Sequence, residues 1–180
     1  MRTPFRFRRT SPRHPDHDYT TPGLYFFTTV VQGRAPILAE VREGWIILTD
    51  AGRIVADCLE TLPQRMSDVS VDTFVVMPDH VHAILQFGAP HVRLSSVVGQ
   101  IKGASARFIN AHWGCTGGPV WQRGYYDRII RNSAELALFR VYIAENPARW
   151  LTRNAEQDDG SRAGNARKRH PREHTSAVRG

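Results

Sequence analysis

The stretch from Val69 to Phe87, "VSVDTFVVMPDHVHAILQF", sets the fold that the sequence predicts. Its two halves are rich in β-branched and aromatic residues, which favour strands. Between them, Pro78 and Asp79 suit the two central positions of a tight type I turn. The stretch is therefore predicted to be a β-hairpin whose second strand begins at His80.

The second strand of this hairpin places two histidines on one side. Alternate residues of a strand point to the same face, so His80 and His82 share one face while Val81 and Ala83 belong to an apolar face that should pack against helices. The Cα atoms of the two histidines would lie about 7 Å apart. Two imidazoles at that separation can converge on one metal ion. By itself the pattern is a weak signal for a metal site, because two histidines at the end of a surface hairpin give the same pattern.

The segments around the hairpin alternate between strand and helix patterns. The order is that of the split βαβ, or ferredoxin-like, α+β fold, with an antiparallel sheet, helices on one face and an added C-terminal helix. The other predicted elements are a strand over 23–31, a loop with Gly33, Pro36 and Gly44, a helix over 49–66, a helix over 94–113, a strand over 125–131 and a helix over 132–146.

Local signals place the helix ends. Asp50 is a fair N-cap for the first helix, and Asn132 followed by Glu135 approximates a capping box for the last. Pro147 should end the last helix, because the residue before a proline avoids the helical region. We expect an irregular basic arm over 1–18, a single domain over 19–151 and a disordered basic tail over 152–180.

The amino-acid composition indicates which kinds of partner to expect. The 180-residue chain has a formal net charge of +7, with arginines crowded toward both ends, which favours a polyanion such as nucleic acid. Cys58 and Cys115 are far apart and form no metal or disulfide motif. No apolar run reaches the roughly 18 residues of a membrane helix, and the N-terminus has no signal-like apolar stretch, so a cytoplasmic, nucleoid-associated protein without membrane partners is expected.

The last predicted helix offers groups that could join the histidines. Tyr142 and Asn146 are one turn apart, on a flank of the apolar stripe formed by Leu136, Phe139 and Ile143. An amide oxygen could complete a two-histidine metal site, with a phenol directed at whatever the ion holds. Two plainer interpretations stay open: Tyr142 as an interfacial aromatic residue and Asn146 as a helix C-cap.

Four segments in order resemble a known family. "YTTPGLYFFTTVVQGR", "MPDHVH", "VWQRGYYDRIIRN" and "YIAENPARW", within the range from about Tyr19 to Trp150, resemble the single-tyrosine transposases of the IS200-like superfamily. More narrowly, they look like the REP-associated tyrosine transposases. The resemblance implies His80 and His82 as metal ligands, Tyr142 as the nucleophile and Asn146 as the third ligand. Asp79 departs from the asparagine more usual at its position.

The resemblance implies a metal-dependent endonuclease and strand transferase for single-stranded DNA. Such an enzyme would use Mg²⁺ or Mn²⁺ and a 5′-phosphotyrosine intermediate to cleave and rejoin hairpin or repeat DNA, as a monomer or homodimer. Tyr19, Tyr125 and Tyr126 are rival nucleophiles. Candidates for phosphate contact or base stacking are Lys102, Arg107, Trp121, Arg123, Tyr125, Arg128 and Arg131.

Three other functions fit parts of the pattern. A domesticated relative could bind hairpin DNA without cutting it, a replication initiator or relaxase could share the paired histidines, and a metal-dependent hydrolase could use water as the nucleophile. A covalent protein–DNA adduct that depends on Tyr142 separates the first and last of these from a transposase. The short chain, with no helicase or primase part, argues against the initiator.

Overall fold

The predicted hairpin is present. The structure, a computed structural model, describes residues 22–115 and 117–166, with side chains to residue 154. Strands β4 (Val69–Val76) and β5 (His80–Phe87) pair antiparallel. The Met77 N–H donates to the His80 carbonyl at 2.8 Å, which closes a turn with Pro78 and Asp79 at its tip.

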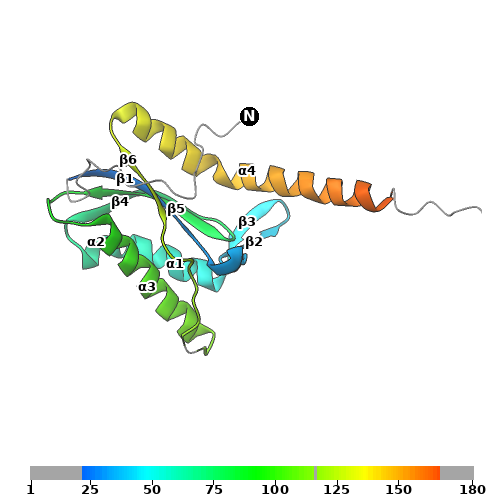
Figure 1. The fold of residues 1–180 in the computed structure, drawn as a ribbon, viewed down its shortest axis with the longest axis horizontal. Coiled ribbons are helices and arrows are strands. Elements are labelled where there is room, and N and C mark those ends of the chain that lie inside the picture. Colours follow the sequence, from blue (N-terminus) through cyan, green and yellow to red (C-terminus); the bar gives the residue numbers. More distant parts are fainter. Residues whose placement is uncertain (1–21, 116, 167–180) are drawn as a thin grey trace, which may run out of the picture. The chain divides into compact units, whose positions relative to one another are not determined.

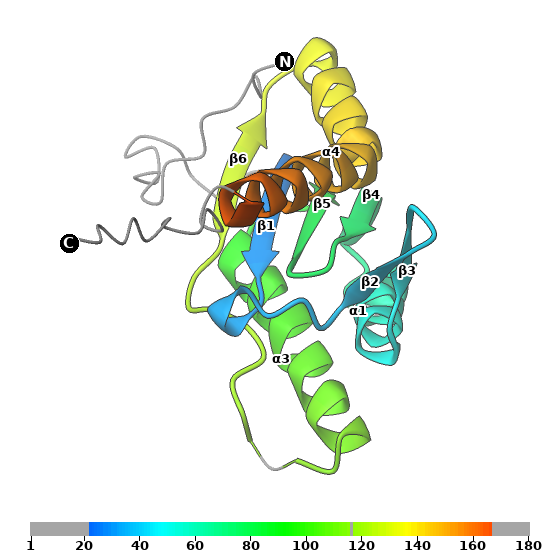
Figure 2. The ribbon, with the colours of Figure 1, turned by 90° about the vertical axis from the view of Figure 1, so that its right-hand side faces the viewer.

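The main sheet has the ferredoxin-like order that the sequence predicts. Strands β1 (Gly23–Val30) and β6 (Tyr126–Ile130) complete a four-stranded sheet in the order β4-β5-β1-β6, and every neighbouring pair is antiparallel (Figure 2). In this register Thr28 of β1 lies opposite His82, and Val30 lies opposite His80. The sheet thus brings an N-terminal strand directly against the two histidines.

Two helices cover one face of the sheet. Helices α1 (Asp50–Glu60) and α3 (Leu94–His112) lie side by side on this face, below the strands in Figure 1. Val81, Ala83 and other β5 residues of the same face are buried among apolar side chains of both helices, as predicted. This is the main hydrophobic core, and burial of its large aliphatic side chains stabilises the fold by roughly 1.5–3 kcal/mol each.

The first part of helix α4 (Ser133–Ala166) covers the opposite face. Phe139 and Ile143 of α4 are buried against Phe26, Ile84 and Ile130 of the sheet, and form a second, smaller core. Figure 1 shows the start of α4, in yellow, on the other side of the strands from α1 and α3. The histidines lie on this α4 face, because they alternate with the residues of the main core.

The predicted loop after β1 is wrong in part. A 3₁₀ turn, η1 (Gln32–Arg34), is followed by a small hairpin of β2 (Ala39–Arg42) and β3 (Trp45–Leu48). The two residues at its tip, Glu43 and Gly44, have φ angles of 51° and 79°. Positive φ at both central positions is what a tight type I′ hairpin requires, and glycine adopts it without cost. A glutamate in the first position gave no sequence signal for that turn.

The first helix also differs from the prediction. Its N-cap is Thr49, not Asp50: the Thr49 Oγ1 accepts from the Gly52 N–H at 3.1 Å and donates to the Ile37 carbonyl at 2.6 Å. The helical pattern breaks at Thr61, and a separate turn, α2 (Leu62–Arg65), begins with a proline in its first turn. Proline is tolerated there because its missing N–H would have no helical partner.

Helix α4 begins as predicted and ends later. The Asn132 Oδ1 accepts from the Glu135 N–H at 2.8 Å, which confirms the N-cap. The predicted end at Pro147 is wrong, because the helix continues through it to Ala166, over residues that from 152 on are expected to be disordered. The chain divides into two compact units between Pro147 and Ala148. The predicted arm over 1–18 and the last residues of the predicted tail, 167–180, lie outside the described residues.

Among the helices that the structure describes, none is both long enough and apolar enough to cross a membrane.

Candidate functional site

The two histidines of β5 converge. Their Nε2 atoms are 3.1 Å apart, and their ring centroids are 4.6 Å apart with the planes at 75°. His80 is 8% exposed and His82 is 4% exposed. The prediction that the strand brings both imidazoles together is confirmed.

The outer nitrogen of each ring is held by another side chain. His80 Nδ1 lies 2.5 Å from the Asp79 Oδ1, and His82 Nδ1 lies 2.6 Å from the Thr28 Oγ1. An ionised carboxylate only accepts hydrogen bonds, so His80 Nδ1 carries the proton of this contact, and the lone pair of a neutral His80 ring is on Nε2. The Thr28 hydroxyl can play the same part for His82. The structure thus presents two Nε2 atoms toward a common point.

This spacing fits a bound divalent cation. Two ligand atoms that are each about 2.1 Å from an ion, at right angles, are about 3 Å apart. The observed 3.1 Å between the two Nε2 atoms matches that separation. Within residues 22–115 and 117–166 no group of three or more His, Cys, Asp or Glu side chains is arranged to hold a metal ion.

Tyr142 reaches the histidine pair from α4. Its hydroxyl oxygen lies 3.5 Å from the His82 Nε2, and the two rings meet edge to face at 5.2 Å. The Phe26 ring lies between strand and helix, 5.5 Å from the His82 ring and 6.0 Å from the Tyr142 ring. Tyr142 is 7% exposed, so the phenol is held by packing on several sides.

Asn146 lies one helical turn beyond Tyr142. It is 2% exposed, and its Nδ2 donates to the Tyr142 carbonyl at 3.0 Å. With the nitrogen engaged in this way, Oδ1 is the atom of the amide that could bind a cation. The alternative that Asn146 is a C-cap is wrong, because α4 continues beyond it.

Arg34 is a site residue that sequence reasoning missed. Its Nη1 donates to the Asp79 Oδ2 at 2.9 Å, while the other carboxylate oxygen faces His80. Burial by itself would raise the pKa of Asp79, but the hydrogen bonds and positive charge offered by His80 and Arg34 outweigh it and lower the pKa. Arg34 is 45 residues from Asp79, and nothing in the local sequence links them.

The predicted DNA contacts separate into several groups. Trp121 is 7% exposed and its Nε1 donates to the Ser105 Oγ at 3.0 Å, so the structure places it in the main core instead of on a stacking surface. The Lys102 ammonium donates to the carbonyls of Gln122 and Gly124, both at 2.8 Å, and so holds the loop before β6. Burial lowers the pKa of Lys102.

Other candidates lie nearer to the histidines. Arg123 and Tyr125 line a polar hollow together with Thr28, the residue that bonds His82. Tyr125 also packs against the main core. Arg128 lies opposite Phe26 in the sheet, on the face that α4 covers.

Two arginines lie away from that hollow. Arg131 is exposed, and its backbone N–H donates to the Glu135 carboxylate at the start of α4. Arg107 belongs to α3, on the opposite side of the sheet. Of the rival nucleophiles, Tyr126 lies opposite Thr28 in the sheet, and Tyr19 is outside the described residues.

Known proteins resemble this chain over most of its length. An uncharacterised protein of Haemophilus influenzae is 26% identical over 162 residues, covering 79% of this chain and 89% of its own. A second Haemophilus influenzae protein, named provisionally as a REP-associated tyrosine transposase, is 25% identical and covers 73% of this chain and 74% of its own. A solved structure of a REP-associated tyrosine transposase bound to a REP hairpin has a TM-score of 0.57 at 21% identity, over 74% of this chain and 71% of that one.

The solved structure shows a shared fold, and so confirms the predicted α+β class. The profile of the family described as "Transposase IS200 like" matches residues 48–146. That range contains both histidines, Tyr142 and Asn146, and it is more than half of the chain. The chain therefore belongs to the IS200-like transposase family.

Proposed function

We propose that this chain is a metal-dependent endonuclease and strand transferase for single-stranded DNA that uses Tyr142 as its nucleophile. The observation that carries the proposal is the meeting of three buried groups: the Tyr142 hydroxyl is 3.5 Å from the His82 Nε2, which is 3.1 Å from the His80 Nε2. A phenol beside two converging imidazoles is the arrangement needed to attack a phosphate that is held by a cation.

The residues around the pair fit such a cation. His80, His82 and Asn146 would hold Mg²⁺ or Mn²⁺, which when bound supplies positive charge to a non-bridging phosphate oxygen. Asp79 and Thr28 fix both rings so that their Nε2 lone pairs face inward. Mixed nitrogen and oxygen ligands suit Mn²⁺ somewhat better than Mg²⁺, while Mg²⁺ is the more available ion.

The proposed Tyr142 step forms one bond to phosphorus and breaks another. The phenol oxygen attacks phosphorus and loses its proton, the bond from phosphorus to the 3′ oxygen breaks, and that oxygen takes up a proton. The product is a 5′-phosphotyrosine on Tyr142 and a free 3′-hydroxyl. Because the phosphodiester energy is kept in the covalent bond, a 3′-hydroxyl can reverse the step and rejoin DNA without another energy source.

Hairpin or repeat DNA is the substrate class that we propose. The structural neighbour is a REP-associated tyrosine transposase bound to a REP hairpin, and Asn146 in place of glutamine favours that branch of the family. The chain's +7 charge suits a phosphate backbone. The polar hollow that Thr28 and Arg123 line lies beside the histidines, where a nucleotide next to the scissile phosphate would be held.

Trapping of a covalent adduct tests the proposal. Wild-type protein is incubated with Mn²⁺ and a labelled hairpin oligonucleotide that has a single-stranded flank. Its sequence is taken from the DNA that flanks the gene, and covalent species are separated on a denaturing gel. We expect a labelled adduct in wild type and none in Tyr142→Phe, with hairpin affinity retained. Tyr126→Phe is the matched control, because Tyr126 lies on the same side of the sheet and should still form adduct.

Two results would contradict the proposal. If wild type binds the hairpin but never forms an adduct, the chain is a non-catalytic hairpin-binding protein. Strand cleavage without any adduct would instead indicate a hydrolase with a water nucleophile.

A further inference from the structure

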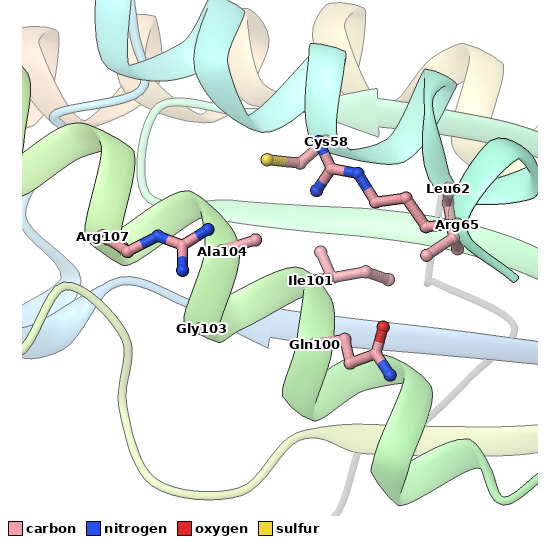
Figure 3. Close-up of a pocket in the computed structure, with 8 residues that line it drawn as sticks. All are labelled: Cys58, Leu62, Arg65, Gln100, Ile101, Gly103, Ala104 and Arg107. Carbon is pink, nitrogen blue, oxygen red and sulfur yellow. The ribbon is translucent and has the colours of Figure 1, made fainter.

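A second hollow lies on the far side of the sheet from the histidines. It is lined by helices α1 and α3 and the short turn α2, and has a volume of about 290 Å³, near the lower end of the range for small-ligand sites. Figure 3 shows its lining residues, which are Cys58, Leu62, Arg65, Gln100, Ile101, Gly103, Ala104 and Arg107. The catalytic chemistry proposed above uses none of them.

Two arginines give this hollow its charge. The side chains of Arg65 and Arg107 run toward each other from opposite ends of the gap between the helices (Figure 3). No acidic side chain is among the lining residues, and neither arginine takes part in an ion pair within the described part of the chain. Two like charges at one hollow whose lining contains no acidic residue raise its affinity for an anion.

The remainder of the lining is apolar and leaves room. Leu62, Ile101 and Ala104 also line it, and the Cys58 side chain is buried there. A Cβ atom added to Gly103 would meet no heavy atom within 4 Å, so no packing contact requires glycine at this position inside α3. Glycine is disfavoured inside a helix, and Gly103 is one of the residues that line the hollow.

We propose that this hollow binds a nucleotide unit of the DNA strand, with its phosphate between Arg65 and Arg107 and its base or sugar over the apolar floor. Arginine forks bind phosphate oxygens in pairs, and base faces pack on apolar surface. The inference rests on the proposed function, since it takes single-stranded DNA as the ligand. The sheet lies between this hollow and His80, so the phosphate held here is not the one that is cut.

Charge removal tests the site. In Arg65→Gln/Arg107→Gln, hairpin affinity measured by fluorescence anisotropy at about 0.1 M salt should fall 5- to 20-fold. The salt slope should fall by about 0.7, the value for one phosphate contact to a single strand. The matched control is Arg53→Gln/Arg93→Gln, which removes the same charge from exposed positions on α1 and at the start of α3. The control should lose less than 2-fold.

A second measurement separates strand binding from binding of a free nucleotide. Thymidine 5′-monophosphate is titrated into wild type and into the Arg65→Gln/Arg107→Gln variant by isothermal calorimetry, and weak binding to wild type alone is expected. If Arg65→Gln/Arg107→Gln and Arg53→Gln/Arg93→Gln lose the same hairpin affinity, the hollow is not a nucleotide site. Nucleotide binding with unchanged hairpin affinity overturns the assignment to a DNA strand.

The two proposals fail separately. Tyr142→Phe should leave hairpin affinity and its salt slope unchanged. If wild type never forms an adduct, the catalytic proposal alone is wrong. If Arg65→Gln/Arg107→Gln does not lower hairpin affinity, the proposed nucleotide site is wrong, and the proposal of adduct formation at Tyr142 still stands.

Discussion

Removal of the Asp79 carboxylate should weaken the metal binding that we propose for the histidine pair. In Asp79→Ala the His80 Nδ1 loses its acceptor at 2.5 Å, and Arg34 loses its partner at 2.9 Å. Without that acceptor, the His80 ring can rotate and can exchange its proton between the two nitrogens. A share of the molecules would then present an N–H, and not a lone pair, toward the ion.

The size of this effect follows from the contacts. Partners that hold a metal-binding histidine in place are typically worth 10- to 100-fold in metal affinity, or about 1.4 to 2.7 kcal/mol. The short contact and the 4% exposure of Asp79 favour the upper part of that range. Asp79→Asn keeps an acceptor oxygen and should lose less than 10-fold. Arg34→Ala should lose less than 5-fold, because the Arg34 side chain is 61% exposed and its ion pair is screened by water.

Binding of Mn²⁺ by each variant, measured as free ion by electron paramagnetic resonance, checks this order. Asp50→Ala is the matched control, because it removes an exposed carboxylate that pairs with Arg53 away from the site. Circular dichroism establishes that each variant is folded. The reasoning is wrong if folded Asp79→Ala binds Mn²⁺ within 2-fold of wild type. It is also wrong if Asp79→Asn loses as much affinity as Asp79→Ala, since charge and not ring orientation would then be decisive.

Three further predictions concern the core and the loop before β6. Trp121→Phe removes a buried hydrogen bond to Ser105 and should lower the free energy of unfolding by about 1 kcal/mol in a denaturant titration, with hairpin affinity unchanged. Burial lowers the pKa of Lys102, so the unfolded chain keeps this proton to higher pH than the folded chain does. The free energy of unfolding of wild type relative to Lys102→Met should therefore rise with pH in the alkaline range below about 10.4. A difference that falls with pH in this range would contradict the prediction. Burial raises the pKa of the Cys58 thiol, so iodoacetamide at neutral pH should modify exposed Cys115 at least 10-fold faster, as followed by peptide mass spectrometry; equal rates would contradict this.

The central hairpin could be predicted because its signals are local. A proline–aspartate turn between two β-rich runs sets the register, and the period of two in a strand then places His80 and His82 on the face away from the main core. The helical period placed Tyr142 and Asn146 one turn apart on one flank. Tyr142 meets His82 only because of the sheet order and the return of α4 to the sheet, which the family resemblance implied and residue spacing alone did not.

Other features depended on contacts that no local pattern shows. Arg34 reaches Asp79 only because the Leu38 and Val31 N–H groups bond the carbonyls of Pro78 and Asp79, which fastens the segment after β1 to the turn. The end of α4 was placed wrongly because a proline is a probable and not a certain helix end. Pro147 removes one N–H donor, the partner that the Ile143 carbonyl would otherwise have, and the helix continues on its remaining bonds.

One aromatic side chain links the histidines to the phenol. Phe26 stacks on His82 at 5.5 Å and on Phe139 at 4.7 Å, and it meets the edge of Tyr142 at 6.0 Å. Because Phe139 and Tyr142 are three residues apart on one helix, the contact that seats Phe139 on the sheet also sets the rotation of α4. A rotation by one residue, about 100°, would turn Tyr142 away from the His82 imidazole. The position of the proposed nucleophile is therefore determined by apolar packing of the strand before it is influenced by any bound ion.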